Sequence, residues 1–382
     1  MSLLCVHYFP TFSYNLKRKF GLSLSKSKII YAAFFIFLRK AFSLLAPICA
    51  LIFTFYPEIS RIDNILTKSS DKKEANSIFP IAVKNVICSV NHIDSRTNVI
   101  NNDDQLMIYF VTPTYPRPEQ VPQLTRLGHT LMHVSRIHWI VADDQAICSK
   151  PVANILSRTG LPFTHISSPK PYRYSTSHFP RGVANRRAAL SWIRSHAKNG
   201  VLYFGDDDNT FDLQLFEEIR QTKKVSMFPV GLLPGYGVSA PVVKYGKVAG
   251  FFDSWPAART FAVDMAGFAV NIDFIKPTTT MPYAEGYEED MFLCSLDLKL
   301  EDIEPLANNC SKILVWHTKS VKVKKANIHI NTDKLNNNTE IQGFANLLKE
   351  LVITGLAKVS SDKESSYPKI VRDHKLYSPF DL

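Results

Sequence analysis

The chain has 382 residues, of which 46% are hydrophobic, and its formal net charge is +11. This length predicts one large domain or two smaller ones, and the apolar fraction is sufficient for a packed core. The basic charge alone would suit a nucleic-acid-binding protein. It is gathered, however, before an N-terminal apolar segment and near the C-terminus, whereas the middle of the chain is mixed in sign. We therefore expect no nucleic-acid partner.

The N-terminal part contains two apolar runs, 29–38 and 41–56, which are separated by Arg39 and Lys40. As a helix the second run would reach roughly 24 Å, slightly less than a hydrocarbon core of ~30 Å. It can span if the two basic side chains snorkel or if the span begins near residue 29. Because basic residues precede it, the positive-inside rule places residues 1–40 in the cytosol and makes 41–56 a signal-anchor. A cleaved signal peptide is the alternative, which the long basic lead disfavours.

Residues 57–104 are polar and show no sustained helical or strand period. This composition predicts a stem, a tether with little fold of its own. Four cysteines would then lie on the lumenal side, where disulfides can form: Cys88, Cys148, Cys294 and Cys310. Four cysteines allow three pairings, and the sequence does not choose among them. A link between two chains through Cys88, or free buried cysteines, remain the alternatives.

Strand and helix patterns alternate between residues 105 and 228. Near-continuous apolar runs at 106–111, 137–142 and 201–204 are typical of buried strands, and 163–166 is a short strand. Helical patterns cover 123–134, 152–158, 185–198 and 213–220. This alternation predicts an α/β fold with a Rossmann-like parallel sheet covered on both faces.

The pattern changes after residue 228. A loop at 231–237 is followed by a hairpin with strands at 242–243 and 248–252, a strand-like run at 265–272, a helix at 288–298 and a last strand at 313–316. We interpret residues 229–320 as a second, mixed α/β subdomain across a cleft. Residues 321–382 form a C-terminal extension with a helical pattern at 341–353, and its role is not readable.

Three consecutive carboxylates, Asp206, Asp207 and Asp208, follow the apolar run 201–204. They repel one another, so a solvated turn and a cation site are the two interpretations. Tyr115 and Asp144 follow two other predicted strands, and ligand sites of parallel sheets lie beyond the carboxyl ends of the strands. This convergence favours a site for a hard divalent cation, Mn²⁺ or Mg²⁺, that holds a diphosphate.

Five segments in chain order resemble the β-1,3-glucuronosyltransferases of glycosyltransferase family 43. They are Val-Thr-Pro-Thr-Tyr at 111–115, Pro-Arg-Gly-Val-Ala-Asn-Arg at 180–186, the strand and aspartates at 203–210, Val-Asp-Met-Ala-Gly-Phe-Ala-Val at 263–270, and Leu-Val-Trp-His-Thr at 314–318. The resemblance implies a GT-A fold in which 105–228 bind the UDP-sugar and 229–320 bind the acceptor. It also implies a single-pass type II Golgi membrane protein with a lumenal catalytic domain, commonly a homodimer.

The implied reaction is the transfer of glucuronic acid from UDP-glucuronate to the 3-hydroxyl of a terminal galactose, with inversion and with Mn²⁺ as cofactor. The acceptor glycan would belong to the proteoglycan linkage region or to a related glycoprotein or glycolipid. On the donor side the resemblance implies contacts from Tyr115 and Asp144 to uracil, from Arg181, Arg186 and His317 to uridine, donor sugar and diphosphate, and from Asp206 and Asp207 to ribose and neighbouring arginines. It makes Asp208 the direct metal ligand.

The same resemblance assigns the acceptor side. Glu289 matches the catalytic glutamate and would be the general base, although an acidic first helical turn is the structural alternative. Glu288 and Asp290 should point elsewhere, since neighbours on a helix lie about 100° apart. The residues that match acceptor contacts are Trp255, Arg259 and Asp264.

Three positions depart from the pattern of the family. Ser239 stands where a glutamate holds the acceptor galactose, Gly237 stands at a usual arginine, and Lys319 replaces an arginine that contacts the diphosphate. A different acceptor, or a transferase-like protein that binds sugar without turnover, is therefore the alternative function. The sequons at Asn309 and Asn337 predict N-glycosylation in the lumen.

Overall fold

The computed structural model describes residues 85–96, 105–174, 180–255, 257, 259–320, 325–337, 342–360, 370–372 and 375–377. The predicted cytosolic tail, the predicted signal-anchor and most of the predicted stem lie outside these residues. Within the part of the chain that the structure describes, no helix is both long and apolar enough to cross a bilayer.

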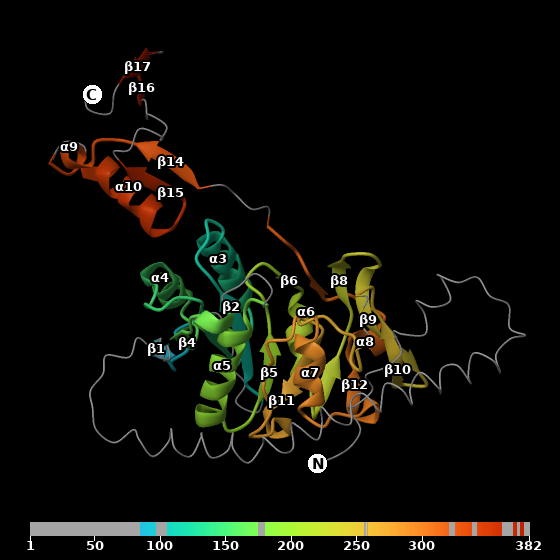
Figure 1. Cartoon of the computed structure of the whole chain (residues 1–382). Coiled ribbons are helices and arrows are strands. Elements are labelled where there is room, and N and C mark those ends of the chain that lie inside the picture. Colours follow the sequence, from blue (N-terminus) through green and yellow to red (C-terminus); the bar gives the residue numbers. More distant parts are fainter. Residues whose placement is uncertain are drawn as a thin grey trace, which may run out of the picture. The chain divides into compact units, whose positions relative to one another are not determined.

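An eight-stranded mixed sheet forms the centre of the fold (Figure 1). Its order is β1 (Val86–Asn91), β4 (Phe163–Ser167), β3 (Ile137–Asp143), β2 (Ile108–Thr114), β5 (Val201–Phe204), β11 (Phe268–Asn271), β7 (Val225–Met227) and β12 (Ile303–Pro305). The four strands from β4 to β5 run parallel, as the alternating pattern predicted. β1 and β11 each pair antiparallel with this block.

Helices cover both faces of the parallel strands, which explains why these strands are mostly apolar. The helices of this part are α3 (Gln120–Leu131), α4 (Lys150–Thr159), α5 (Val183–His196) and α6 (Leu213–Ile219). On β2, Phe110 belongs to the core that includes residues of α3, α4 and α6, whereas Val111 faces the core that includes α5. The predicted parallel sheet with two covered faces is therefore confirmed.

A second sheet of five strands carries the other half of the site. Its order is β10 (Lys247–Phe252), β9 (Gly237–Lys244), β8 (Val230–Leu233), β13 (Val315–Trp316) and β6 (Thr210–Phe211). Tyr245 and Gly246 both have positive φ, 53° and 73°, as a two-residue hairpin turn requires. Trp316 pairs with Thr210, so this pairing brings the segment after β13 beside the aspartate triplet.

The predicted boundary between subdomains at residues 228 and 229 is crossed by both sheets. β11 and β12 complete the large sheet, and β6 joins the small one. The interpretation of 231–237 as loop was wrong for β8, because this strand is held by partners on both sides. β2 also continues beyond the predicted break at 112–116, through Pro113, where β5 no longer pairs with it. A residue without an N–H is tolerated at such an edge.

The predicted stem is not a simple tether at its C-terminal end. β1 pairs with β4 across a bulge at Cys88, and a disulfide joins Cys88 to Cys148. The sequence had left the pairing open, and this disulfide is one of its alternatives. The thiol of Cys310 lies 3.5 Å from the carbonyl oxygen of Met227, and the thiol of Cys294 lies 3.9 Å from Asp290 Oδ1.

The C-terminal extension contains its own small core. β14 (Ala326–His329) and β15 (Ala357–Ser360) pair in parallel, and α9 (Thr332–Asn337) and α10 (Gln342–Ile353) connect them. The buried residues of this core are Ile330, Leu335, Ala345 and Leu348. The helical pattern predicted at 341–353 is confirmed as α10. A last hairpin pairs β16 (Ile370–Arg372) with β17 (Lys375–Tyr377).

Candidate active site

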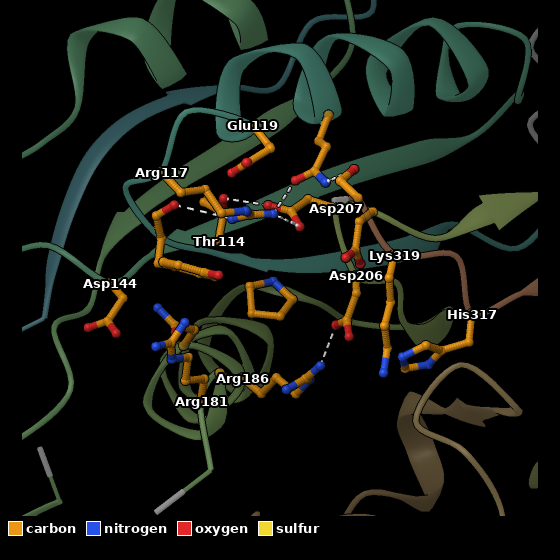
Figure 2. Close-up of a pocket in the computed structure, with 17 residues that line it drawn as sticks. Thr114, Arg117, Glu119, Asp144, Arg181, Arg186, Asp206, Asp207, His317 and Lys319 are labelled. Carbon is orange, nitrogen blue, oxygen red and sulfur yellow. Dashed lines mark hydrogen bonds and ion pairs between the residues drawn. The ribbon is translucent and has the colours of Figure 1, made fainter. Parts of the chain in front are cut away.

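A cavity of about 570 Å³ lies at the carboxyl ends of β2, β3 and β5. It gathers all eight residues that were predicted for the donor and the metal, which are Tyr115, Asp144, Arg181, Arg186, Asp206, Asp207, Asp208 and His317. Figure 2 shows how Asp144, Arg181, Arg186, Asp206 and Asp207 surround it. We call this space the donor cavity.

Two guanidinium groups lie against the ring of Tyr115. The guanidinium carbon of Arg117 is 4.3 Å from the ring centroid, and that of Arg181 is 4.7 Å away. Arg117 is also bonded to Asp207, whereas Arg181 is exposed. A nucleobase that stacks on Tyr115 would therefore displace Arg181 more readily than Arg117.

Asp207 lines the donor cavity and bonds to residues at the carboxyl end of β2. Its carboxylate is buried, accepts a hydrogen bond from Thr114 Oγ1 at 2.7 Å and pairs with Arg117 Nη2 at 2.5 Å. Gln120 Nε2 donates in turn to Thr114 Oγ1 at 3.2 Å. Arg117 was missed by the sequence reasoning, although it stands only two residues after Tyr115.

Asp206 pairs with Arg186 of α5. The Pro-Arg-Gly-Val motif explains this pairing, since Gly182 at the N-cap of α5 has φ +78° and an added Cβ would lie 2.5 Å from Arg186 Nη1. Only glycine leaves room for that guanidinium. Arg187, by contrast, is exposed, as expected for a solvated helix residue.

Asp208 has the electrostatics of a cation ligand. Burial raises the pKa of its carboxyl to about 6, and the neighbouring carboxylates of Asp206 and Asp207 act in the same direction. Its backbone carbonyl accepts hydrogen bonds from Thr318 and from Arg126, which fix the turn.

A divalent cation fits this donor set if substrate supplies further ligands. Among the residues that the structure describes, no cluster of three His, Cys, Asp or Glu side chains could hold a metal. Hard cations are commonly bound by one or two carboxylates together with substrate phosphates and water. Asp208 satisfies that requirement and does not form a closed protein cage.

A second cavity, of about 610 Å³, contains Trp255, Arg259, Asp264 and Glu289, the predicted acceptor residues and base. We call it the acceptor cavity. Glu289 lies in the first turn of α7 (Glu288–Cys294), with 17% of its side chain exposed. Burial raises its pKa to about 7, helped by the charges of Asp264 and Glu288.

Arg259 lies beside Glu289 but bonds more closely to another carboxylate. Its Nη1 lies 3.7 Å from Glu289 Oε2, whereas its Nη2 lies 2.9 Å from Asp253 Oδ1. Glu288 lines the same cavity as Glu289, so the expectation that it points elsewhere was wrong. Asp290 does point away and accepts a hydrogen bond from the backbone of Phe261 at 2.8 Å.

One contact joins the two cavities. His317 Nδ1 lies 3.1 Å from Asp264 Oδ2, and His317 lines the donor cavity while Asp264 lines the acceptor cavity. The hydrogen bond to Asp264 raises the pKa of His317. Sequence reasoning had placed these residues on separate substrates, and their 53-residue separation gave no signal of the contact.

Of the three departures from the family pattern, one, Lys319, lines a cavity. Ser239 is buried in β9, and its hydroxyl has no hydrogen-bond partner among the described residues. Gly237 has φ +75° and nothing within 4 Å of an added Cβ. Lys319 lines the donor cavity. Asn309 is exposed in α8 (Leu306–Cys310), and Asn337 ends α9; glycosylation at both stays a prediction.

The profile of glycosyltransferase family 43 matches residues 127–321. Galactosylgalactosylxylosylprotein 3-beta-glucuronosyltransferase S of Drosophila melanogaster is 52% identical over 277 residues, which are 70% of this chain and 68% of that protein. Galactosylgalactosylxylosylprotein 3-beta-glucuronosyltransferase P of the same organism is 46% identical over 61% of this chain and 50% of its own length. Galactosylgalactosylxylosylprotein 3-beta-glucuronosyltransferase 2 of Homo sapiens is 44% identical over 60% of this chain and 74% of its own length. With half of its residues matched in order, this chain belongs to glycosyltransferase family 43.

Proposed function

We propose that this protein transfers glucuronic acid from UDP-glucuronate to the 3-hydroxyl of a terminal galactose on a glycan, with inversion at the anomeric carbon. The observation that carries the proposal is the pair of adjoining cavities. One is rich in arginines and aspartates, and the other contains a buried glutamate whose pKa is about 7. The named relatives are galactosylgalactosylxylosylprotein 3-beta-glucuronosyltransferases, which supplies the donor sugar and the acceptor class.

The donor cavity has the chemistry to bind a nucleoside diphosphate sugar. Tyr115 and Asp144 offer an aromatic face and a hydrogen-bond acceptor for the base. Arg181 and Arg186 offer planar forks that match phosphate or carboxylate oxygens. Lys319 adds a cation but not a fork, which suits a phosphate less specifically.

Asp208 would hold Mn²⁺ together with the diphosphate of the donor. When bound, the cation supplies Lewis-acid stabilisation of the negative charge on the leaving UDP. The hydrogen bond to Asp264 raises the pKa of His317, which lines the same cavity. Asp206 and Asp207 remain committed to Arg186 and Arg117, so they organise the cavity and leave Asp208 available.

Glu289 acts as the general base. Its carboxylate removes the proton from the acceptor 3-hydroxyl as that oxygen attacks the anomeric carbon of glucuronate from the face opposite UDP. The bond from that carbon to the UDP oxygen breaks, and UDP leaves with the electron pair. A base with a pKa near the working pH is well matched to this transfer.

The remaining expectations belong to the same proposal. They are a GT-A fold, a homodimer, and a type II Golgi membrane protein anchored by residues 41–56. The Cys88–Cys148 disulfide supports an oxidising compartment such as the secretory lumen. Ser239 and Gly237 favour the second candidate, a transferase-like protein that binds sugar without turnover or that takes another acceptor.

The test is incubation of the full chain with Mn²⁺, a galactose-terminated glycan and, in parallel, UDP-glucuronate, UDP-galactose or UDP-N-acetylglucosamine, each radiolabelled. We expect label from UDP-glucuronate alone in the glycan. Equal transfer from another UDP-sugar would overturn the donor assignment. Binding of UDP and glycan without any transfer would favour the second candidate.

A further inference from the structure

Thr318 ends the Leu-Val-Trp-His-Thr segment and has no role in the site described above. It is half-buried and directly follows His317, which lines the donor cavity. Its hydroxyl donates a hydrogen bond to the backbone carbonyl of Asp208, 110 residues earlier in the chain. This contact joins the segment that carries His317 to the turn that carries the candidate metal ligand.

The three aspartates of that turn are held in different ways. The carboxylates of Asp206 and Asp207 are fixed by ion pairs with Arg186 and Arg117. Among the described residues, no side chain forms a hydrogen bond or an ion pair with the carboxylate of Asp208, whose contacts are made by its backbone carbonyl. The direction of this carboxylate therefore depends on the backbone of the turn, and contacts that fix the backbone also fix the carboxylate.

Two side chains hold the carbonyl of Asp208, and they are not equivalent. Arg126 of α3 donates to it from Nη2 at 3.0 Å, but its side chain is exposed. A long solvated side chain loses much rotamer freedom when it is held in one position. Thr318 is short, half-buried and β-branched, so its χ1 angle is already restricted. We expect the threonine to hold the turn more firmly than the arginine.

The segment that carries Thr318 is itself anchored. Trp316 pairs with Thr210 between β13 and β6, and Gln123 Nε2 of α3 donates to Ser320 Oγ at 2.5 Å. The hydroxyls of Thr210 and Thr318 lie 3.2 Å apart. Because Thr318 gives its one hydroxyl proton to the carbonyl of Asp208, Thr210 must be the donor to Thr318. Thr318 thus has fixed supports on both sides of its own position.

We propose that Thr318 is a positioning residue for the divalent cation, acting through the backbone of Asp208. This inference rests on the proposed metal-dependent transfer. Thr318 does not line the donor cavity, whereas Asp208 and His317 both do, and its hydroxyl keeps these two groups in one arrangement. Partners that orient a metal ligand without touching the metal commonly change metal affinity about 10- to 100-fold when they are removed.

The test is a titration of the full chain with Mn²⁺ in the presence of excess UDP, with free Mn²⁺ measured by electron paramagnetic resonance. Thr318→Val keeps the shape of the side chain and removes the hydroxyl, so the Kd for Mn²⁺ should rise about tenfold. Thr318→Ser keeps the hydroxyl and should restore the wild-type Kd. UDP affinity measured in chelator should be the same in all three proteins, because the proposed role acts only through the cation.

Thr125→Val is the matched control. Its hydroxyl also donates to a backbone carbonyl, that of Val121 at 2.8 Å, but within α3 and outside the donor cavity. The Kd of this variant for Mn²⁺ should equal that of wild type. Denaturant titration of both valine variants shows whether each remains folded under the conditions of the binding experiment.

An equal Kd for Mn²⁺ in Thr318→Val and wild type would overturn the inference. An equal loss of UDP affinity in chelator would also overturn it, since a general structural role would weaken UDP binding with or without the cation. These measurements do not depend on sugar transfer, so a wild type that binds Mn²⁺ with UDP but transfers no glucuronate would refute the proposed reaction alone. A wild type that binds no Mn²⁺ would refute the metal assignment and this inference together.

Discussion

The donor cavity and the acceptor cavity hold their carboxylates in different ways. Asp206 and Asp207 each pair with an arginine and help to fix the turn that carries Asp208. Glu289 lies 3.7 Å from Arg259, its one ion-pair partner among the described residues, and that arginine is bonded more closely to Asp253. Burial therefore dominates at Glu289 and raises its pKa to about 7. Paired acids organise a binding site, whereas a poorly paired buried acid can exchange a proton near neutral pH.

The largest expected effect separates these two roles within the first turn of α7. Glu289→Gln keeps the shape of the side chain but cannot accept the proton, so transfer should fall about 10²–10⁴-fold. UDP binding in the presence of Mn²⁺ should remain as in wild type, since the donor cavity is untouched. Rate measurements and UDP titration check this.

Glu288→Gln is the matched comparison, because both glutamates line the acceptor cavity. We expect it to lose far less activity than Glu289→Gln, about tenfold at most, as a side chain that shapes the cavity without taking the proton. If Glu288→Gln is the inactive variant and Glu289→Gln the active one, the general base has been assigned to the wrong glutamate.

Asp208→Ala should weaken donor binding, which Glu289→Gln leaves unchanged. Loss of this carboxylate removes the protein ligand for the cation, so UDP affinity measured with Mn²⁺ should fall at least about 10- to 100-fold, and transfer should fall with it. UDP affinity measured in chelator should be nearly the same in the variant and in wild type. Full transfer by chelator-treated wild type would refute the metal assignment.

The disulfide tests the part of the fold that was predicted to be a tether. Cys88 and Cys148 close a loop with a sequence separation of 60 residues. Replacing Cys148 by Ser should lower the free energy of unfolding by about 2–5 kcal/mol, measured by denaturant titration without reductant. Cys294→Ser, which alters a cysteine outside this disulfide, should change it much less. Equal loss in both variants would mean that the disulfide does not stabilise the fold.

The smallest expected effect is the pH dependence of transfer. The base must be ionised, so kcat/KM should rise with pH and level off above about 7, the pKa of Glu289. Because this pKa lies above the ordinary 4.5, the folded protein holds the proton more tightly than the unfolded chain. Stability should therefore decrease between pH 4.5 and 7 in wild type, and Glu289→Gln should lack that decrease. A flat rate profile from pH 5 to 8 would contradict the assignment.

Much of the large sheet could be predicted, because strands buried on both faces are mostly apolar, as at 137–142 and 201–204. Residues that follow such strands meet at one edge, which brought Tyr115, Asp144 and the aspartate triplet together from pattern alone. β1 was missed because it is an edge strand with exposed and half-buried residues and no apolar run. β8 was missed because its glycine and the following Pro-Gly pair are typical of loops.

The detailed contacts of the site could not be predicted from the sequence, because they depend on how distant segments meet. The contact between Asp264 and His317 depends on how the segments before β11 and after β13 meet. The pairing of Arg117 with Asp207 depends on the turn after β2. The direction of Glu288 could not follow from helical periodicity, because a first turn at a cavity mouth can expose two successive side chains.

The most direct test of the proposed glucuronosyl transfer is the structure of the product. The full chain is incubated with UDP-glucuronate, Mn²⁺ and a galactosyl-galactosyl-xyloside, and the new linkage is determined by NMR. We expect a β-linked glucuronic acid on the 3-hydroxyl of the terminal galactose, because Glu289 directs attack from the face opposite the α-linked UDP. An α-linked product, or attachment at another hydroxyl, would contradict it.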